Sequence, residues 1–211
     1  MKYIIADTET SSVNATTAEM YSFGAFSVET HEDGTLDFNT IKGIHRFFNT
    51  DKEPPGDSIA VHGLTREILR KKSNGDYLED CYQELSEFVF QPDATLVGYN
   101  TQYDRTIITN NFLRAGLNKP VWRNSLDVMQ EQKCLLVGTG YDRQARIKLV
   151  KAADLIFRVK KVYTKEALQS GFDFLVECCG IGNADATYHS ALYDAYTTMM
   201  ILDQILQFKA R

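Results

Sequence analysis

Asp7 and Glu9 are the two acids whose spacing most suggests chemistry, because they directly follow the apolar run Tyr3 to Ala6. Such a run is typical of a strand that is buried on both faces. Residues two apart on a strand point to the same face, so the two carboxyl groups would project together. They would repel one another unless a cation lay between them, and Mg²⁺ and Mn²⁺ prefer such oxygen ligands. The pair therefore predicts a divalent metal site, with an acidic turn at a strand end as the alternative.

Two later pairs of polar residues could complete such a site. Asn100 and Asp104 would share one face of a helix that begins near Asn100, although an Asn N-cap followed by an acid in the first turn is common. His189 and Asp194 would differ by about 140° within one regular helix of 3.6 residues per turn. They can meet only if His189 lies in the loop before a helix that carries Asp194. Each pair alone has a structural explanation, but the three clusters together favour a functional centre.

The elements that must position these residues follow from hydrophobic periodicity and turn signals. The chain opens with a probable meander of three strands, over residues 2–6, 21–28 and 35–47. A loop is expected over 51–57, and the remainder mixes helices over 76–90, 101–114, 165–179 and 190–208 with a strand over 95–99 and a short strand that opens at 121–122. This order predicts an α/β fold with a mixed sheet, and 211 residues suit a single domain, 1–211.

Composition narrows the setting in which the protein works. No apolar run approaches the roughly 20 residues that cross a bilayer, and the N-terminus lacks a signal-peptide core, so we expect a cytoplasmic protein without a membrane partner. The four cysteines lack metal-binding spacing and are expected to be free thiols. The net charge of −5 argues against a nucleic-acid partner. Residues 143–165, however, carry eight basic side chains against one acid, so they could follow a phosphate backbone or simply form a solvated face.

Four short motifs occur in an order that is specific to one family. They are IIADTET, AVHGLT, LVGYNTQYDRTII and YHSALYDAYTT. With them the chain resembles the DEDDh (DnaQ-like) 3′–5′ exonucleases, which include the proofreading subunit of bacterial replicative polymerases, exonuclease X and ribonuclease T. The resemblance extends from residue 3 to about residue 206. Two positions depart from the family pattern, where Ser11-Ser12-Val13 lacks a common glycine and Tyr99 replaces a common histidine; neither concerns a metal ligand.

The resemblance implies a ribonuclease H-like fold, with a mixed central sheet of about five strands flanked by helices. It implies two divalent metal ions, Mg²⁺ or Mn²⁺, and a general base, His189. The implied metal ligands, which with His189 form the catalytic set, are Asp7, Glu9, Asp104 and Asp194. The implied substrate contacts are Thr8, Thr10, His62, Leu64 and Asn100. For His62 a turn histidine without function is an equal alternative, and Phe112 and Trp122 could stack on bases but are better explained as core.

The function predicted in this way is removal of nucleoside 5′-monophosphates from a nucleic acid with a free 3′ end by two-metal-ion hydrolysis, with DNA favoured over RNA. Three alternatives stay open. The first is a proofreading subunit, although nothing in the sequence indicates a polymerase partner. The second is a catalytically silent nucleic-acid-binding module on the same fold, which the presence of all five polar residues argues against. The third is an endonuclease of the ribonuclease H kind. The sequence leaves single-strand or duplex preference and homodimer formation undecided.

Overall fold

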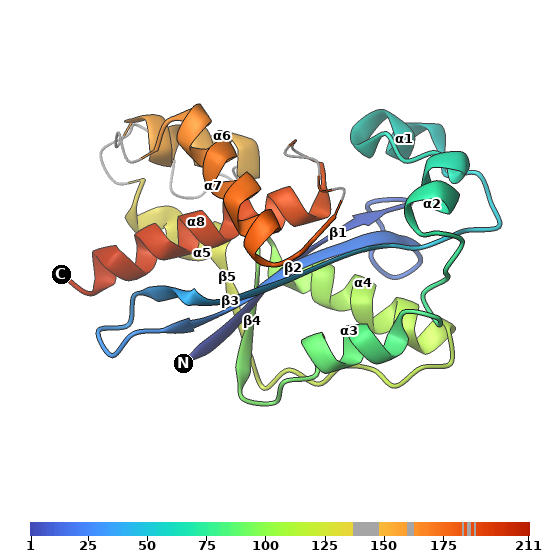
Figure 1. The fold of residues 1–211 in the computed structure, drawn as a ribbon, viewed down its shortest axis with the longest axis horizontal. Helices are drawn as coiled ribbons and strands as arrows, with labels where there is room; N and C mark the ends of the chain where they lie inside the picture. Colours follow the sequence, from blue (N-terminus) through green and yellow to red (C-terminus); the bar gives the residue numbers. More distant parts are fainter. Residues whose placement is uncertain (137–147, 160–162, 183, 185–186, 188) are drawn as a thin grey trace.

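The computed structural model describes residues 1–136, 148–159, 163–182, 184, 187 and 189–211. Its centre is a five-stranded sheet in the order β3-β2-β1-β4-β5, and helices cover both faces (Figure 1). The strands are β1 (Lys2–Thr10), β2 (Met20–Thr30), β3 (Leu36–Phe47), β4 (Ala94–Gly98) and β5 (Asn124–Asp127). Strands β1 to β3 are antiparallel neighbours, whereas β4 runs parallel to β1 and β5 parallel to β4. The predicted α/β fold with a mixed sheet is confirmed.

Strand boundaries differ from the sequence prediction most clearly at the end of β1 and at the start of β5. Strand β1 continues through Asp7 to Thr10, so both acids of the first cluster lie within the strand and not after it. The short strand predicted to open at 121–122 is present, but its predicted start is wrong. Trp122 is instead buried in the core between the sheet and α3–α4, and the strand begins two residues later, at Asn124.

Eight α-helices are described in the ranges given above. They are α1 (Gly56–His62), α2 (Arg66–Lys72), α3 (Tyr82–Val89), α4 (Thr101–Arg114), α5 (Val128–Glu131), α6 (Leu149–Ala153), α7 (Lys165–Cys178) and α8 (Ala191–Lys209). A 3₁₀ turn (Gln132–Cys134) follows α5, and a π-helix (Asp154–Val159) follows α6. Helix α4 has the predicted bounds, and α7 and α8 agree with their predicted ranges within one residue.

The helix predicted over 76–90 is wrong in its first part, because the Tyr77 backbone N–H donates to the Asp80 carboxylate at 2.8 Å and closes a turn. The helix begins only at Tyr82. The expected loop at 51–57 ends at Pro55, because α1 begins at Gly56, and α1 and α2 were not predicted.

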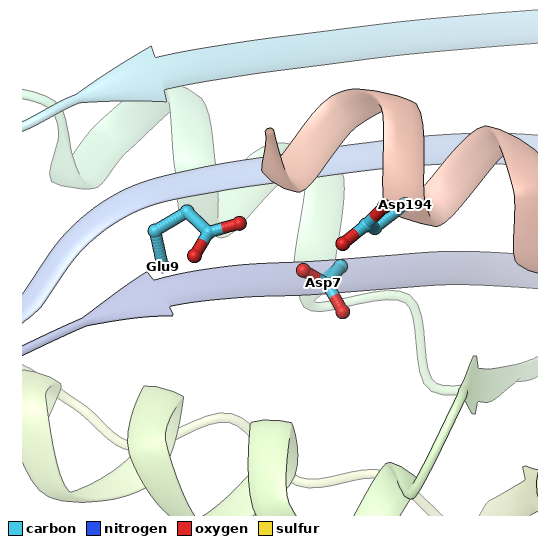
Figure 2. A group of neighbouring side chains, drawn as sticks. All are labelled: Asp7, Glu9 and Asp194. Atoms are coloured by element: carbon cyan, nitrogen blue, oxygen red, sulfur yellow. The ribbon is translucent and has the colours of Figure 1, made fainter. Parts of the chain in front are cut away.

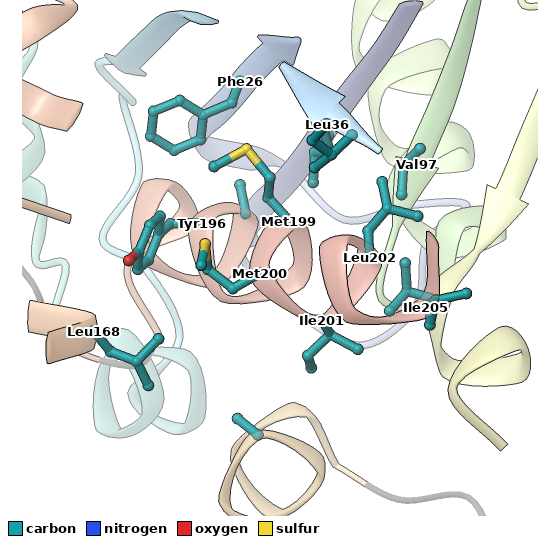
Figure 3. Packing of buried hydrophobic residues seen from close by; sticks show 14 of the residues in the cluster. Phe26, Leu36, Val97, Leu168, Tyr196, Met199, Met200, Ile201, Leu202 and Ile205 are labelled. Atoms are coloured by element: carbon teal, nitrogen blue, oxygen red, sulfur yellow. The ribbon is translucent and has the colours of Figure 1, made fainter. Parts of the chain in front are cut away.

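Two hydrophobic layers hold the sheet between the helices. On one face α8 packs over β1 and β2, where Phe26 and Val97 of the sheet meet Met199, Leu202 and Ile205 of the helix (Figure 3). The second layer lies between the opposite face and helices α3 and α4 (Figure 1). Phe112 and Trp122 are buried in this second layer, which favours the core interpretation of both over base stacking.

Gly24 explains how closely α8 approaches the sheet. It pairs with Asp7 across β1 and β2, and a Cβ atom at this position would lie 2.3 Å from the Leu192 backbone nitrogen. The first turn of α8 therefore rests directly on the Gly24 backbone. This contact fixes the beginning of α8 next to the end of β1, where the first two acids lie.

Other features of the chain bear on the earlier expectations. Among the described residues, no helix combines the length and apolar character that crossing a membrane requires. The four cysteines are free thiols. Within the basic stretch 143–165, residues 143–147 and 160–162 lie outside the described part of the chain, so its proposed contact with a phosphate backbone stays a prediction.

Candidate metal centre

Three carboxylates from two elements converge at the end of β1 (Figure 2). Asp7, Glu9 and Asp194 each offer one oxygen, and these oxygens all lie within 4.8 Å of one another. Asp7 and Glu9 come from β1 and point to the same face of the sheet, as their spacing predicted. Asp194 comes from the first turn of α8, which the glycine contact brings over this face. The structure thus brings Asp194 close to two acids that lie 185 or more positions earlier in the sequence.

Asp104 approaches the same region from the α4 side of the sheet. Its side chain is only 4 % exposed, and its Oδ1 accepts a hydrogen bond from the Thr8 hydroxyl at 2.8 Å. Thr8 points away from Asp7 and Glu9 because side chains alternate along a strand. Asp104 lies outside the 4.8 Å group, yet its charge raises the pKa of both Asp7 and Glu9. It is therefore a neighbour of the three carboxylates.

The pKa values of these acids show how unfavourable the cluster is without a counter-ion. Burial is the largest cause in every case; it raises the pKa of Glu9 to about 8 and the pKa of Asp104 and Asp194 to about 7. The pKa of Asp7 is raised well above its usual range by burial and by the charges of the other three acids. Asp7 is thus the acid whose pKa is raised by the charges of all three other acids.

A second, independent observation also indicates that a divalent cation fits this arrangement. Asp194 Oδ1 is buried and has no hydrogen-bond partner within the described residues. Buried polar atoms are normally satisfied, and converging carboxylates are normally separated by a cation or a proton. An ion bound by Asp7, Glu9 and Asp194 would satisfy the free oxygen and offset the repulsion. Oxygen-only donors of this kind suit hard ions such as Mg²⁺ and Mn²⁺.

His189 lies just before α8, outside the helix, in the position that its spacing from Asp194 requires. Its backbone is in the left-handed region with φ 66°, and its N–H donates to Asp194 Oδ2 at 3.2 Å. The imidazole itself is exposed to solvent. One residue thus fixes a carboxylate through its backbone and leaves its side chain free for chemistry.

His62 joins the α1–α2 turn to the end of β1. Its Nδ1 accepts a hydrogen bond from the Leu64 backbone N–H at 3.0 Å. The proton of the neutral ring is therefore on Nε2, which donates to the Thr10 carbonyl at 3.3 Å. Burial, opposed by this hydrogen bond to Thr10, lowers the pKa of His62, and the charge of His189 lowers it further. Both ring nitrogens are engaged within the protein.

The other predicted substrate contacts differ in how much surface they offer. Leu64 is only 6 % exposed and packs against Tyr21 and Leu69. Asn100, with φ 83°, occupies the turn before α4, where its N–H donates to Asp127 Oδ1 at 3.3 Å. Neither residue belongs to the carboxylate group.

Sequence reasoning missed two local roles near the site. The first is the hydrogen bond from Thr8 to Asp104. The second is Tyr103, whose hydroxyl lies 2.8 Å from the Thr10 hydroxyl and donates to the Ser12 carbonyl at 2.7 Å. Tyr103 thereby holds the segment that follows β1. Its position next to Asp104 in the same motif was the available signal.

Comparison with known proteins identifies the class to which this site belongs. The sequence model of the exonuclease family matches residues 4–202, a range that includes all five residues of the predicted catalytic set. The chain therefore belongs to this exonuclease family. No curated protein sequence matches the chain.

Solved structures add the fold. E. coli exonuclease I, in a zinc-bound complex with single-stranded DNA, is 15 % identical with a TM-score of 0.65, and the match covers 98 % of this chain and 42 % of that one. Exonuclease X, in complex with 5′ overhanging duplex DNA, is 17 % identical with a TM-score of 0.57, and the match covers 99 % and 93 %. The chain thus spans less than half the length of exonuclease I. The predicted ribonuclease H-like fold is confirmed.

Proposed function

We propose that this protein removes nucleoside 5′-monophosphates from the 3′ end of DNA, in preference to RNA, and that residues 1–211 form one exonuclease domain. The observation that carries the proposal is the group of three carboxylate oxygens within 4.8 Å of one another, together with the buried Asp194 Oδ1, which has no hydrogen-bond partner among the described residues. DNA as the substrate is supported by the exonuclease I and exonuclease X structures, both of which contain DNA. A cytoplasmic location accords with the free thiols.

The four acids would hold two divalent ions, Mg²⁺ or Mn²⁺. Asp7 is the best candidate to bridge them, since the charges of Glu9, Asp104 and Asp194 all act on it. Bound ions of this kind lower the pKa of water and offset the charge that develops on a phosphodiester. Asp194, fixed by the His189 backbone, and Asp104, fixed by Thr8, would be held in place before substrate arrives.

His189 would act as the general base. Its exposed imidazole is adjacent to the carboxylate group through its own backbone bond to Asp194. From there it would take the proton of the water that attacks the terminal phosphorus. The bond that breaks joins this phosphorus to the 3′ oxygen of the preceding nucleotide, so the released nucleotide keeps a 5′ phosphate.

The experiment compares DNA and RNA oligonucleotides of the same sequence, labelled at the 5′ end, with the full chain in Mg²⁺, in Mn²⁺ and in EDTA. We expect metal-dependent shortening from the 3′ end, faster on DNA, with release of 5′-mononucleotides. Asp7→Ala should abolish it, whereas Asp93→Ala, at an exposed acid remote from the cluster in the sequence, should retain it.

Each failure of this assay has its own meaning. Intact oligonucleotides under both metals would overturn the enzyme and favour a silent binding module. Cleavage of a circular single strand would favour an endonuclease. Faster shortening of RNA would refute the preference for DNA, and substantial activity of Asp7→Ala would remove Asp7 from the centre.

A further inference from the structure

Ser22 is a buried polar residue next to the carboxylate group that no step above uses. It lies on β2 directly opposite Glu9 in the antiparallel register, and its side chain is only 1 % exposed. Its hydroxyl has no hydrogen-bond partner in the described part of the chain. Directly opposite residues of an antiparallel pair share a face, with Cβ atoms about 4.5–5.5 Å apart. The Ser22 hydroxyl is thus beside Glu9, on the face where Asp7 and Asp194 converge.

Ser22 is flanked across the sheet by one directly opposite residue on each neighbouring strand. On its other side the residue directly opposite is Phe47 of β3, which offers neither a donor nor an acceptor. A side chain so thoroughly buried does not reach nucleic acid in solvent. The polar group that remains in this cross-strand row is the Glu9 carboxyl, itself only 8 % exposed.

We infer that Ser22 is a positioning residue for the metal centre, whose hydroxyl donates a hydrogen bond to the Glu9 carboxylate and orients it toward the bound ion. A carboxylate has two oxygens, so one can accept from Ser22 while the other faces the metal. Rotation about the Ser22 Cα–Cβ bond redirects the hydroxyl without movement of the backbone. Carboxylate ligands are generally held by such outer hydrogen bonds, and loss of one weakens metal affinity about 10–100-fold. The inference rests on the proposed metal-dependent function.

The test measures Mn²⁺ affinity of the full chain by isothermal titration calorimetry, without substrate, together with thermal melting in EDTA. Ser22→Ala should bind Mn²⁺ about 10–100-fold more weakly. In EDTA it should melt no lower than the wild type, because the hydroxyl that it removes has no hydrogen-bond partner among the described residues. A serine with a merely structural role would show the reverse, namely a lower melting temperature and unchanged affinity.

Ser27→Ala is the matched control. Ser27 lies on the same strand and is 2 % exposed, but it pairs with Ile4 and therefore faces the opposite side of the sheet. Its Mn²⁺ affinity should equal that of the wild type. If Ser22→Ala also keeps wild-type affinity, the role of Ser22 is refuted while the proposed function stands. If the wild type binds no Mn²⁺, the metal centre itself is refuted, and the role of Ser22 with it.

Discussion

Replacing Gly24 with alanine tests whether the close contact between β2 and α8 creates the site. The added Cβ would lie 2.3 Å from the Leu192 nitrogen and 2.5 Å from both the Leu192 Cα and the Ala191 carbonyl carbon. Contacts between such atoms are most favourable at about 3.5–4.0 Å, so the gap must widen by roughly 1 Å. All three atoms belong to the backbone, so no side-chain rotation relieves the clash. The first turn of α8, which carries Asp194, must therefore move away from Asp7.

The expected effects on stability and on activity follow from this displacement. Forcing an extra carbon into a packed interior costs about 1–3 kcal/mol, and for a chain of this size each kcal/mol lowers the melting temperature by about 2–4 °C. We therefore expect Gly24→Ala to melt roughly 2–12 °C below the wild type. A misplacement of about 1 Å at a reacting centre can cost about 100-fold in rate, so kcat/KM in the oligonucleotide assay should fall by about that factor.

Gly56→Ala is the control for this substitution. Apart from its chain neighbours and the backbone of its own helix, no described atom lies within 4 Å of the Cβ that it would add, so neither its melting temperature nor its kcat/KM should fall. The reasoning is refuted if Gly24→Ala keeps the wild-type melting temperature and rate, because α8 would then not depend on the glycine. A drop in both variants would show a general cost of replacing glycine.

Two further predictions concern the acids themselves. The folded-state pKa of Glu9 is about 8 and that of Asp104 and Asp194 about 7, above their unfolded values near about 4, so the folded chain binds more protons. In EDTA the protein should therefore lose stability as the pH rises from about 4 to about 8. Melting temperatures in EDTA that stay flat or rise across this window would contradict the prediction. Saturating Mg²⁺ should weaken the trend. Thr8→Val removes the hydroxyl that donates to Asp104 and should lower kcat/KM about 10–100-fold. Thr8→Ser retains a hydroxyl and should largely keep the wild-type kcat/KM. Equal rates for both variants would show that this hydrogen bond does not position Asp104.

Longer elements with clear end signals were predictable from the sequence, and short ones were not. The helix over 101–114 ends shortly before Gly116, as predicted, and the shared face of Asp7 and Glu9 follows from the alternation of side chains along a strand. Helices α1 and α2 contain only seven residues each, too few for a periodic pattern to distinguish them from turns. What defines α2 is instead a local cap, in which the Thr65 hydroxyl accepts from the Ile68 N–H. Side-chain caps and turns of this kind depend on geometry that a hydrophobic pattern does not encode.

The meeting of Asp104 and Asp194 could be predicted only by resemblance, because it depends on how strand β1 faces two helices at once. Alternation along β1 directs Asp7 toward α8 and Thr8 toward α4, so one short run of residues contacts Asp194 on one side and Asp104 on the other. The register of β1 against β2 decides whether this works, because Gly24, opposite Asp7, lets the backbone of α8 lie against the sheet. A slip by one residue would place Phe23 or Ala25 opposite Asp7, and it would also turn the Asp7 and Glu9 side chains to the wrong face. The glycine and the acids are therefore one structural unit, although Gly24 lies 15 positions from Glu9, the acid of the centre nearest to it in the sequence.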